Sequence, residues 1–163
     1  MGCYCLSKCL SKMDVSFDFY DYVLKLTCQI PKGKISTYKE LALALGDEIS
    51  ARAVGTALNR NPTPVKIPCH RVIHSDGRIG GYKLGVEKKI ELLKKEGFVI
   101  ENESKKEDAR IKNFLAHVFR NFHSNHPLKE MKKIQDDLSK QIVAEDVNDY
   151  SNMVICGADV AYS

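Results

Sequence analysis

Residues 37–62, TYKELALALGDEISARAVGTALNRNP, carry the clearest structural pattern in the sequence. Thr37 can cap a helix whose body runs into Gly46, and Ser50 can cap a second helix that stops before Pro62. Two short helices separated by a tight turn are typical of a helix-turn-helix. This stretch therefore predicts such a motif in the N-terminal half of the chain.

The flanking segments extend this motif into a small domain. Apolar residues recur at helical spacing over residues 16–29 and again over residues 86–96, where Gly97 supplies a stop. Between them, three prolines in residues 62–68 exclude a regular helix. The β-prone RVI and the turn HSDG that follow predict a short hairpin or wing within residues 62–85.

The composition changes after Gly97. The run ENESKKED predicts a charged linker, and two further helical patterns follow it, divided at His126-Pro127. The final apolar run MVICGADVAY predicts a buried strand; such a strand needs hydrogen-bonding neighbours, so we expect the sequence to be cut short there. The expected fold is mainly α with a small β wing, a winged helix-turn-helix domain plus a helical C-terminal extension. The expected parts are an N-terminal extension 1–15, the winged-helix domain 16–100, a charged linker and helix 101–125, and a C-terminal segment 126–163.

The composition indicates a globular protein with a mildly basic N-terminal block. Hydrophobic residues make up 44% of the chain and charged residues 28%, which excludes wholesale disorder. Residues 1–100 carry 16 basic and 10 acidic side chains, whereas residues 101–163 carry 9 and 11. The basic block is compatible with a phosphate-bearing partner, although charge alone decides little.

The six cysteines match neither a secreted disulfide framework nor a paired metal site, which favours reduced, intracellular thiols. Cys3, Cys5 and Cys9 could hold a metal, but an accidental extension is the better interpretation. The opening residues carry too few apolar side chains for a secretory signal, and no run approaches the roughly 20 apolar residues of a membrane span. We expect an intracellular protein, cytoplasmic in a prokaryote or nuclear in a eukaryote, with no membrane contact.

The segment PCHRV, residues 68–72, carries the chemical signal. His70 and Arg71 give Cys69 an electropositive setting that favours the nucleophilic thiolate. A cysteine beside a histidine is by itself more often a packed core residue. The upstream RAVGTALNRNP and the downstream GxxGGYxxGxxxKxxLLxxEG change that balance. Together, over residues 16–97, these motifs resemble the C-terminal domain of the O6-alkylguanine-DNA alkyltransferases.

This resemblance implies a methylated-DNA-[protein]-cysteine S-methyltransferase that acts once. It would flip O6-alkylguanine out of double-stranded DNA, because a thiol cannot reach O6 inside the stack. Cys69 would take the alkyl group, while His70, linked to the thiol through a water and held by Glu96, would help form the thiolate. Tyr38 would give a proton to the leaving guanine, and Asn61 would act as a hinge of the active-site loop. No cofactor and no metal would be required, and we expect a monomer.

The resemblance also implies a DNA-binding surface. Arg52 would enter the stack and fill the space of the flipped base, although an isolated arginine is more often a solvated surface residue. Lys83 stands where some members have serine, and its extra charge can touch phosphate. The small residues Ala51, Ala53 and Gly55 would allow close approach to the minor groove, and further contacts to DNA or base would come from Lys39, Arg71, Val72, Ser75, Tyr82 and Lys83, partly through backbone groups.

The end of the chain has a second, weaker resemblance. LKEMKKIQDDLSKQIV followed by MVICGADVAYS is similar to the opening helix and first strand of endonuclease V, with Asp159 matching a metal-binding carboxylate. A single carboxylate cannot hold a catalytic magnesium, so we expect no nuclease activity without an intact endonuclease V domain. The simplest account is an alkyltransferase that lacks the family's usual N-terminal domain and is fused to a truncated nuclease. Alternatively, the tail packs on the repair domain as an ordinary extension.

Two other functions remain open. The first is an alkyltransferase-like protein that recognises the lesion without accepting the alkyl group; such relatives typically carry tryptophan in place of the cysteine, and this chain keeps Cys69. The second is a helix-turn-helix transcription regulator, which would leave PCHRV and Glu96 unexplained.

Overall fold

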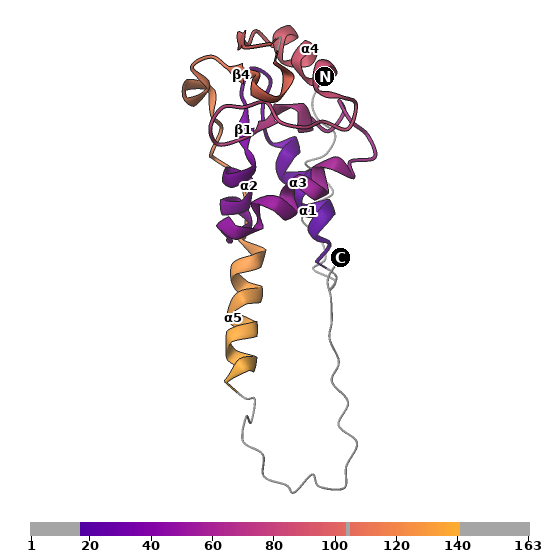
Figure 1. The fold of residues 1–163 in the computed structure, drawn as a ribbon. Helices are drawn as coiled ribbons and strands as arrows, with labels where there is room; N and C mark the ends of the chain where they lie inside the picture. The colour runs from indigo at the N-terminus through magenta and orange to yellow at the C-terminus, as the bar shows by residue number, and fades with distance from the viewer. Residues whose placement is uncertain (1–16, 104, 141–163) are drawn as a thin grey trace, which may run out of the picture.

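A computed structural model describes residues 17–103 and 105–140 (Figure 1). Five α-helices and four two-residue strands follow one another in this part of the chain, with short 3-10 turns between them. The helices are α1 (Phe19–Cys28), α2 (Tyr38–Leu45), α3 (Ala51–Asn59), α4 (Val86–Lys95) and α5 (Pro127–Ser139); the strands are β1 (Ser36–Thr37), β2 (Val72–Ile73), β3 (Ile100–Glu101) and β4 (Arg110–Ile111).

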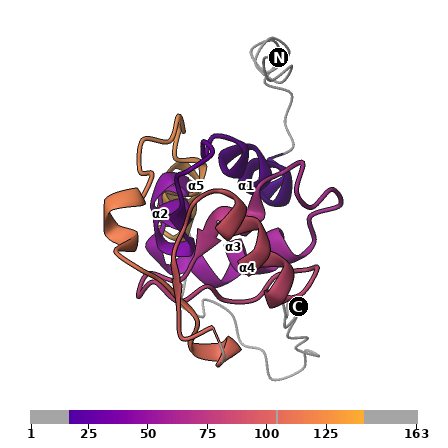
Figure 2. The same ribbon diagram turned by 90° about the horizontal axis from the view of Figure 1, so that it is seen from above.

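The first three helices form the predicted helix-turn-helix. Figure 2 shows α1 and α2 beside α3, and both helices contact it. Thr37 caps α2 as predicted, because its hydroxyl accepts a hydrogen bond from the Glu40 N–H at 3.1 Å. Gly46 ends α2 with a φ of 97°, a left-handed conformation that glycine adopts without strain. The buried side chains between the three helices are Val23, Leu26, Leu41, Leu45, Val54, Ala57 and Leu58.

The start of α3 differs from the prediction. Ser50 precedes the helix but makes no side-chain cap; its hydroxyl donates instead to the Asp47 carbonyl at 2.7 Å. Asp47 caps a 3-10 turn over residues 48–50, where its carboxylate accepts from the Ile49 N–H. The predicted cap is therefore wrong, because the turn leads directly into α3 and already occupies the serine.

The predicted wing is only partly confirmed. The HSDG turn is present, since the His74 N–H donates to the Arg78 carbonyl at 2.9 Å. However, β2 does not pair with the residues after the turn; it pairs in parallel with β1, with Val72 opposite Ser36. The strand-like residues after the turn pair with a later segment, because Ile79 N–H donates to the Ala109 carbonyl at 2.9 Å.

That later segment corrects the expected linker. Residues 101–125 contain no α-helix in the described part of the chain; β3 and β4 form an antiparallel hairpin, and two 3-10 turns flank β4. Ala109 and Ile111 are buried in a second core with Ile79 and Phe98. Glu101 ends β3 and the other charges of ENESKKED lie in the hairpin loop, while the apolar residues beyond them complete the domain. The domain therefore continues past residue 100.

The chain then crosses back over the helix-turn-helix before α5 begins. The Phe119 N–H donates to the Ile35 carbonyl at 2.6 Å, and Phe119 packs against the first core. The predicted helix after Pro127 is confirmed as α5, which extends away from the body of the domain (Figure 1). No described helix is long and apolar enough to cross a membrane. The predicted final strand, Asp159 and the three N-terminal cysteines lie outside the described residues.

Candidate active site

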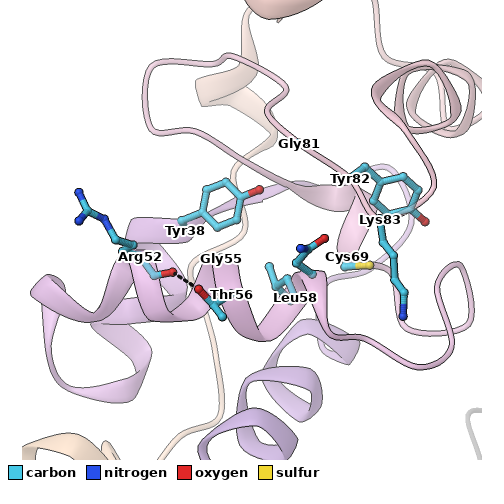
Figure 3. Close-up of a pocket in the computed structure, with 10 residues that line it drawn as sticks. Tyr38, Arg52, Gly55, Thr56, Leu58, Cys69, Gly81, Tyr82 and Lys83 are labelled. Atoms are coloured by element: carbon cyan, nitrogen blue, oxygen red, sulfur yellow. Dashed lines mark hydrogen bonds between the residues drawn. The ribbon is translucent and has the colours of Figure 1, made fainter. Parts of the chain in front are cut away.

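A pocket of about 520 Å³ opens between α3 and the loop that precedes α4 (Figure 3). One wall is formed by α3, and the opposite wall by residues 81–83. Tyr38, at the start of α2, completes the lining. The lining residues are Tyr38, Arg52, Gly55, Thr56, Leu58, Asn59, Cys69, Gly81, Tyr82 and Lys83.

Cys69 lines this pocket with a thiol that is only 4% exposed. It begins the 3-10 turn over residues 69–71, and its Sγ accepts a hydrogen bond from Asn61 Nδ2 at 3.1 Å. Asn61 is fully buried; its amide also donates to the Ile67 carbonyl and accepts from the Thr63 N–H. Asn61 therefore ties both sides of the 62–68 loop to the thiol.

A buried ionic cluster lies next to the thiol. His70 Nε2 is 3.0 Å from Glu96 Oε1, and Arg71 donates to both oxygens of the same carboxylate at 2.8–3.0 Å. Burial lowers the pKa of His70, and the Glu96 carboxylate opposes this only in part. Burial alone would raise the pKa of Glu96, but hydrogen bonds from Arg71 and His70 outweigh it and lower that pKa. His70 Nδ1 is buried and has no hydrogen-bond partner among the described residues.

Tyr38 keeps its phenolic proton at neutral pH. Burial, together with the charge of Cys69, raises its pKa to about 12. Its ring packs against His74, with ring centroids 5.2 Å apart. Burial and Cys69 likewise raise the pKa of Tyr82 to about 12. Two phenols that can donate but not easily ionise therefore line the pocket.

Some of the predicted DNA-contacting residues are exposed, and others point into the interior of the domain. Arg52 extends outward from the start of α3, at the end of the pocket opposite Cys69 (Figure 3). The guanidinium of Arg71 points inward, where it pairs with Glu96 and also donates to the Ile30 carbonyl at 2.7 Å. Lys39 is exposed on α2 but paired with Glu48. Ala51, Ala53 and Gly55 lie along α3 with Ala53 exposed, Ser75 is exposed in the HSDG turn, and Val72 is fully buried.

The downstream motif in the sequence includes Lys89, but the sequence interpretation assigned it no role. This lysine is fully buried on α4, and its Nζ donates to the carbonyls of Val72, Ile79 and Gly81 at 2.6, 2.7 and 3.2 Å. Burial lowers its pKa to about 7, although the charge of Cys69 acts in the opposite direction. Lys89 lies four residues before Leu93, which is buried, and this spacing places both side chains on the same face of the helix. The spacing alone therefore indicated that Lys89 could be buried. Lys89 joins β2 to the loop that walls the pocket.

These features define a class: a helix-turn-helix protein with a buried cysteine thiol in a pocket beside its third helix. Residues 18–98 match the family described as 6-O-methylguanine DNA methyltransferase, DNA binding domain. A methylated-DNA--protein-cysteine methyltransferase of Methanosarcina barkeri is 52% identical over 79 residues, covering 48% of this chain and 50% of that protein. The chain belongs to this O6-methylguanine-DNA methyltransferase family.

Two further similarities extend beyond residue 98. A bifunctional methyltransferase/endonuclease of Picrophilus torridus is 42% identical over 147 residues, which is 90% of this chain and 46% of that protein. The crystal structure of S. pombe Atl1 in complex with damaged DNA containing O6-carboxymethylguanine is 34% identical, with a TM-score of 0.54 over 62% of this chain and 94% of Atl1. The chain therefore spans about half the length of the curated relatives it matches.

Proposed function

We propose that this domain repairs O6-alkylguanine in duplex DNA by transferring the alkyl group irreversibly to Cys69. The observation that carries the proposal is the thiol itself, which lines a pocket large enough to admit a nucleobase, next to the His70–Glu96 pair. The homologues named above as methyltransferases support the reaction class. A nucleobase reaches such a pocket only if it leaves the base stack.

Proton transfer from the thiol is the first step of the proposed reaction. Glu96 occupies His70 Nε2, so Nδ1 is the ring nitrogen left to accept the Cys69 proton, through a water in our proposal. The lowered pKa of His70 keeps the imidazole neutral at pH 7, which is the form that can act as a base. Asn61 would then hold the sulfur by donating to it.

The second step breaks the bond between the alkyl carbon and O6. The thiolate forms a carbon–sulfur bond as the electron pair of the carbon–oxygen bond moves onto the guanine, which we propose takes a proton from Tyr38. The raised pKa of Tyr38 ensures that the phenol carries this proton at neutral pH. The proposed reaction needs no cofactor, because the thiolate, the alkyl carbon and the proton donor account for every bond made and broken. The thioether product leaves each molecule inactive after one turnover.

DNA binding is proposed to run along α3. Arg52 lies at the outer end of the pocket, where it could replace the flipped base, and the neighbouring small residues allow close approach to a groove. We expect binding to depend on salt and little on sequence, because phosphate contacts dominate such interfaces.

Recognition without transfer is the second candidate function. The similarity to S. pombe Atl1 over 94% of its length favours it. The cysteine in the pocket argues for transfer, because recognition alone does not require a nucleophile. A transcription regulator would leave the buried thiol and its ionic cluster without a role.

A pair of cysteine variants tests the proposal. Cys69→Ser should abolish transfer of a labelled methyl group from an O6-methylguanine duplex, while binding to the lesion persists. Cys28→Ser is the matched control, since Cys28 is exposed and lies outside the pocket, and it should react like the wild type. Transfer that survives in Cys69→Ser would overturn the proposal.

The same reactions run with Mg²⁺ test our expectation that residues 1–163 do not cut the oligonucleotide. The name of the Picrophilus torridus relative includes an endonuclease, which makes this control necessary.

A further inference from the structure

The charged side chains that line the pocket are all positive. Two of its ten lining residues, Arg52 and Lys83, are cationic, and none is a carboxylate. The two cations occupy different ends, with Arg52 at the outer end and Lys83 at the end that holds Cys69 (Figure 3). The thiol end of the pocket is therefore positive, although the group that transfers there in methyl repair is neutral.

Lys83 is connected to the thiol through one residue. Its Nζ donates to the Asn61 carbonyl at 2.8 Å, and the Asn61 side chain donates to Cys69 Sγ at 3.1 Å. The ammonium and the sulfur thus contact opposite ends of the same buried asparagine. Because both groups contact one residue and the lysine side chain is long and flexible, we expect its ammonium to reach an alkyl group that Cys69 attacks.

The charge of Lys83 is not neutralised by a carboxylate. Its recorded partner is a neutral backbone carbonyl, and no ion pair involves it in residues 17–103 and 105–140. Lys39, by contrast, is paired with Glu48 at 2.5 Å. An ammonium has three N–H groups, so Lys83 can accept an anionic partner without losing its bond to Asn61.

We propose that Lys83 makes this site select O6-adducts that carry a negative charge, of which O6-carboxymethylguanine is the simplest. This inference rests on the proposed alkyl transfer. The adduct carboxylate would pair with the Lys83 ammonium while the Cys69 thiolate attacks the adjacent CH₂ carbon. The carbon–O6 bond breaks, guanine leaves with a proton from Tyr38, and the product is S-carboxymethylcysteine. The lysine offsets the repulsion between thiolate and carboxylate that would otherwise slow this attack.

The test compares O6-carboxymethylguanine with O6-carbamoylmethylguanine, its neutral amide of nearly the same shape, in single-turnover reactions on one duplex sequence. Lys83→Met should lower the ratio of the carboxymethyl rate to the amide rate about tenfold, equivalent to about 1.4 kcal/mol, on top of any loss that both adducts share because the bond to Asn61 is removed. Lys83→Arg should restore the preference. Lys66→Met, which removes an exposed charge outside the pocket, should affect both rates equally and little.

Each other outcome has a distinct meaning. Equal slowing of both adducts in Lys83→Met, relieved at high salt, would assign Lys83 to a DNA phosphate and overturn the inference. Unchanged rates for both adducts would also overturn it. If wild-type protein does not transfer methyl to Cys69 from O6-methylguanine in the same duplex, the proposed function itself has failed, whereas transfer of methyl or of the amide group without the carboxymethyl group contradicts only the charge selection.

Discussion

Replacing Lys89 with methionine should change how the stability of the domain depends on pH. Lys89 is fully buried, and burial lowers its pKa from 10.5 to about 7. A lysine in the unfolded chain keeps the higher value, so between about pH 7 and 10.5 the unfolded chain binds more protons than the folded one. The free energy of unfolding contributed by this group therefore rises with pH across that window.

The magnitude follows from the size of the pKa change. One pKa unit corresponds to about 1.4 kcal/mol, so the charge costs the fold about 5 kcal/mol below pH 7, and roughly 2 kcal/mol of this is recovered by about pH 9. Methionine does not titrate. It also leaves three carbonyls without their donor, which lowers stability by an amount that stays nearly constant with pH.

Urea unfolding of the wild type and Lys89→Met at several pH values measures the effect. The difference in unfolding free energy should grow by about 2 kcal/mol in favour of the wild type between about pH 7 and pH 9. The series stays below pH 10, because Tyr38 and Tyr82 keep their protons to about pH 12 in the fold but lose them earlier when unfolded. Lys88→Met, on the exposed side of α4, is the control. A difference that stays constant with pH would show that Lys89 does not titrate differently in the folded and unfolded chain.

Three further predictions follow from the site. Glu96→Gln should slow alkyl transfer about a hundredfold and leave lesion binding intact, because His70 loses the carboxylate that orients it; an unchanged single-turnover rate would remove Glu96 from the reaction. Arg52→Ala should weaken repair of duplex more than reaction with the free base, and equal losses on both would exclude insertion into the stack. Gly80→Ala should lower the unfolding free energy by about 1–3 kcal/mol in thermal melts, since φ is +72° and the new Cβ would lie 2.6 Å from His74 Nε2; a melting temperature equal to that of the wild type would contradict this.

Local signals in the sequence were sufficient to place α1 to α5 and the thiol, although they also predicted a helix within residues 101–125 that the described residues lack. The Thr37 cap, the glycine after α2 and the helical spacing of α4 each depend on residues close together in the chain, and the structure contains all three elements. The PCHRV motif likewise places Cys69 and His70 side by side. Their meeting with Glu96 was expected only from the family resemblance, and the structure brings the histidine and carboxylate to 3.0 Å.

The errors arose where distant segments meet. Ile111 belongs to the domain because β4 pairs with β3 and with the residues after the HSDG turn, and ENESKKED alone gives no sign of that pairing. The inward position of the Arg71 guanidinium could not be predicted locally, because its partners, Glu96 and the Ile30 carbonyl, lie 25 and 41 residues away. Lys89 was overlooked among the charged residues of α4, because its partners are backbone carbonyls of another segment.

Intact-protein mass spectrometry tests the central proposal most directly. The protein is incubated with an excess of duplex containing O6-methylguanine, and the product is then mapped by peptide. We expect a gain of one methyl group per molecule, located on Cys69, that does not increase with further substrate. An unmodified protein that still binds the lesion would contradict alkyl transfer and identify the domain as a recognition module.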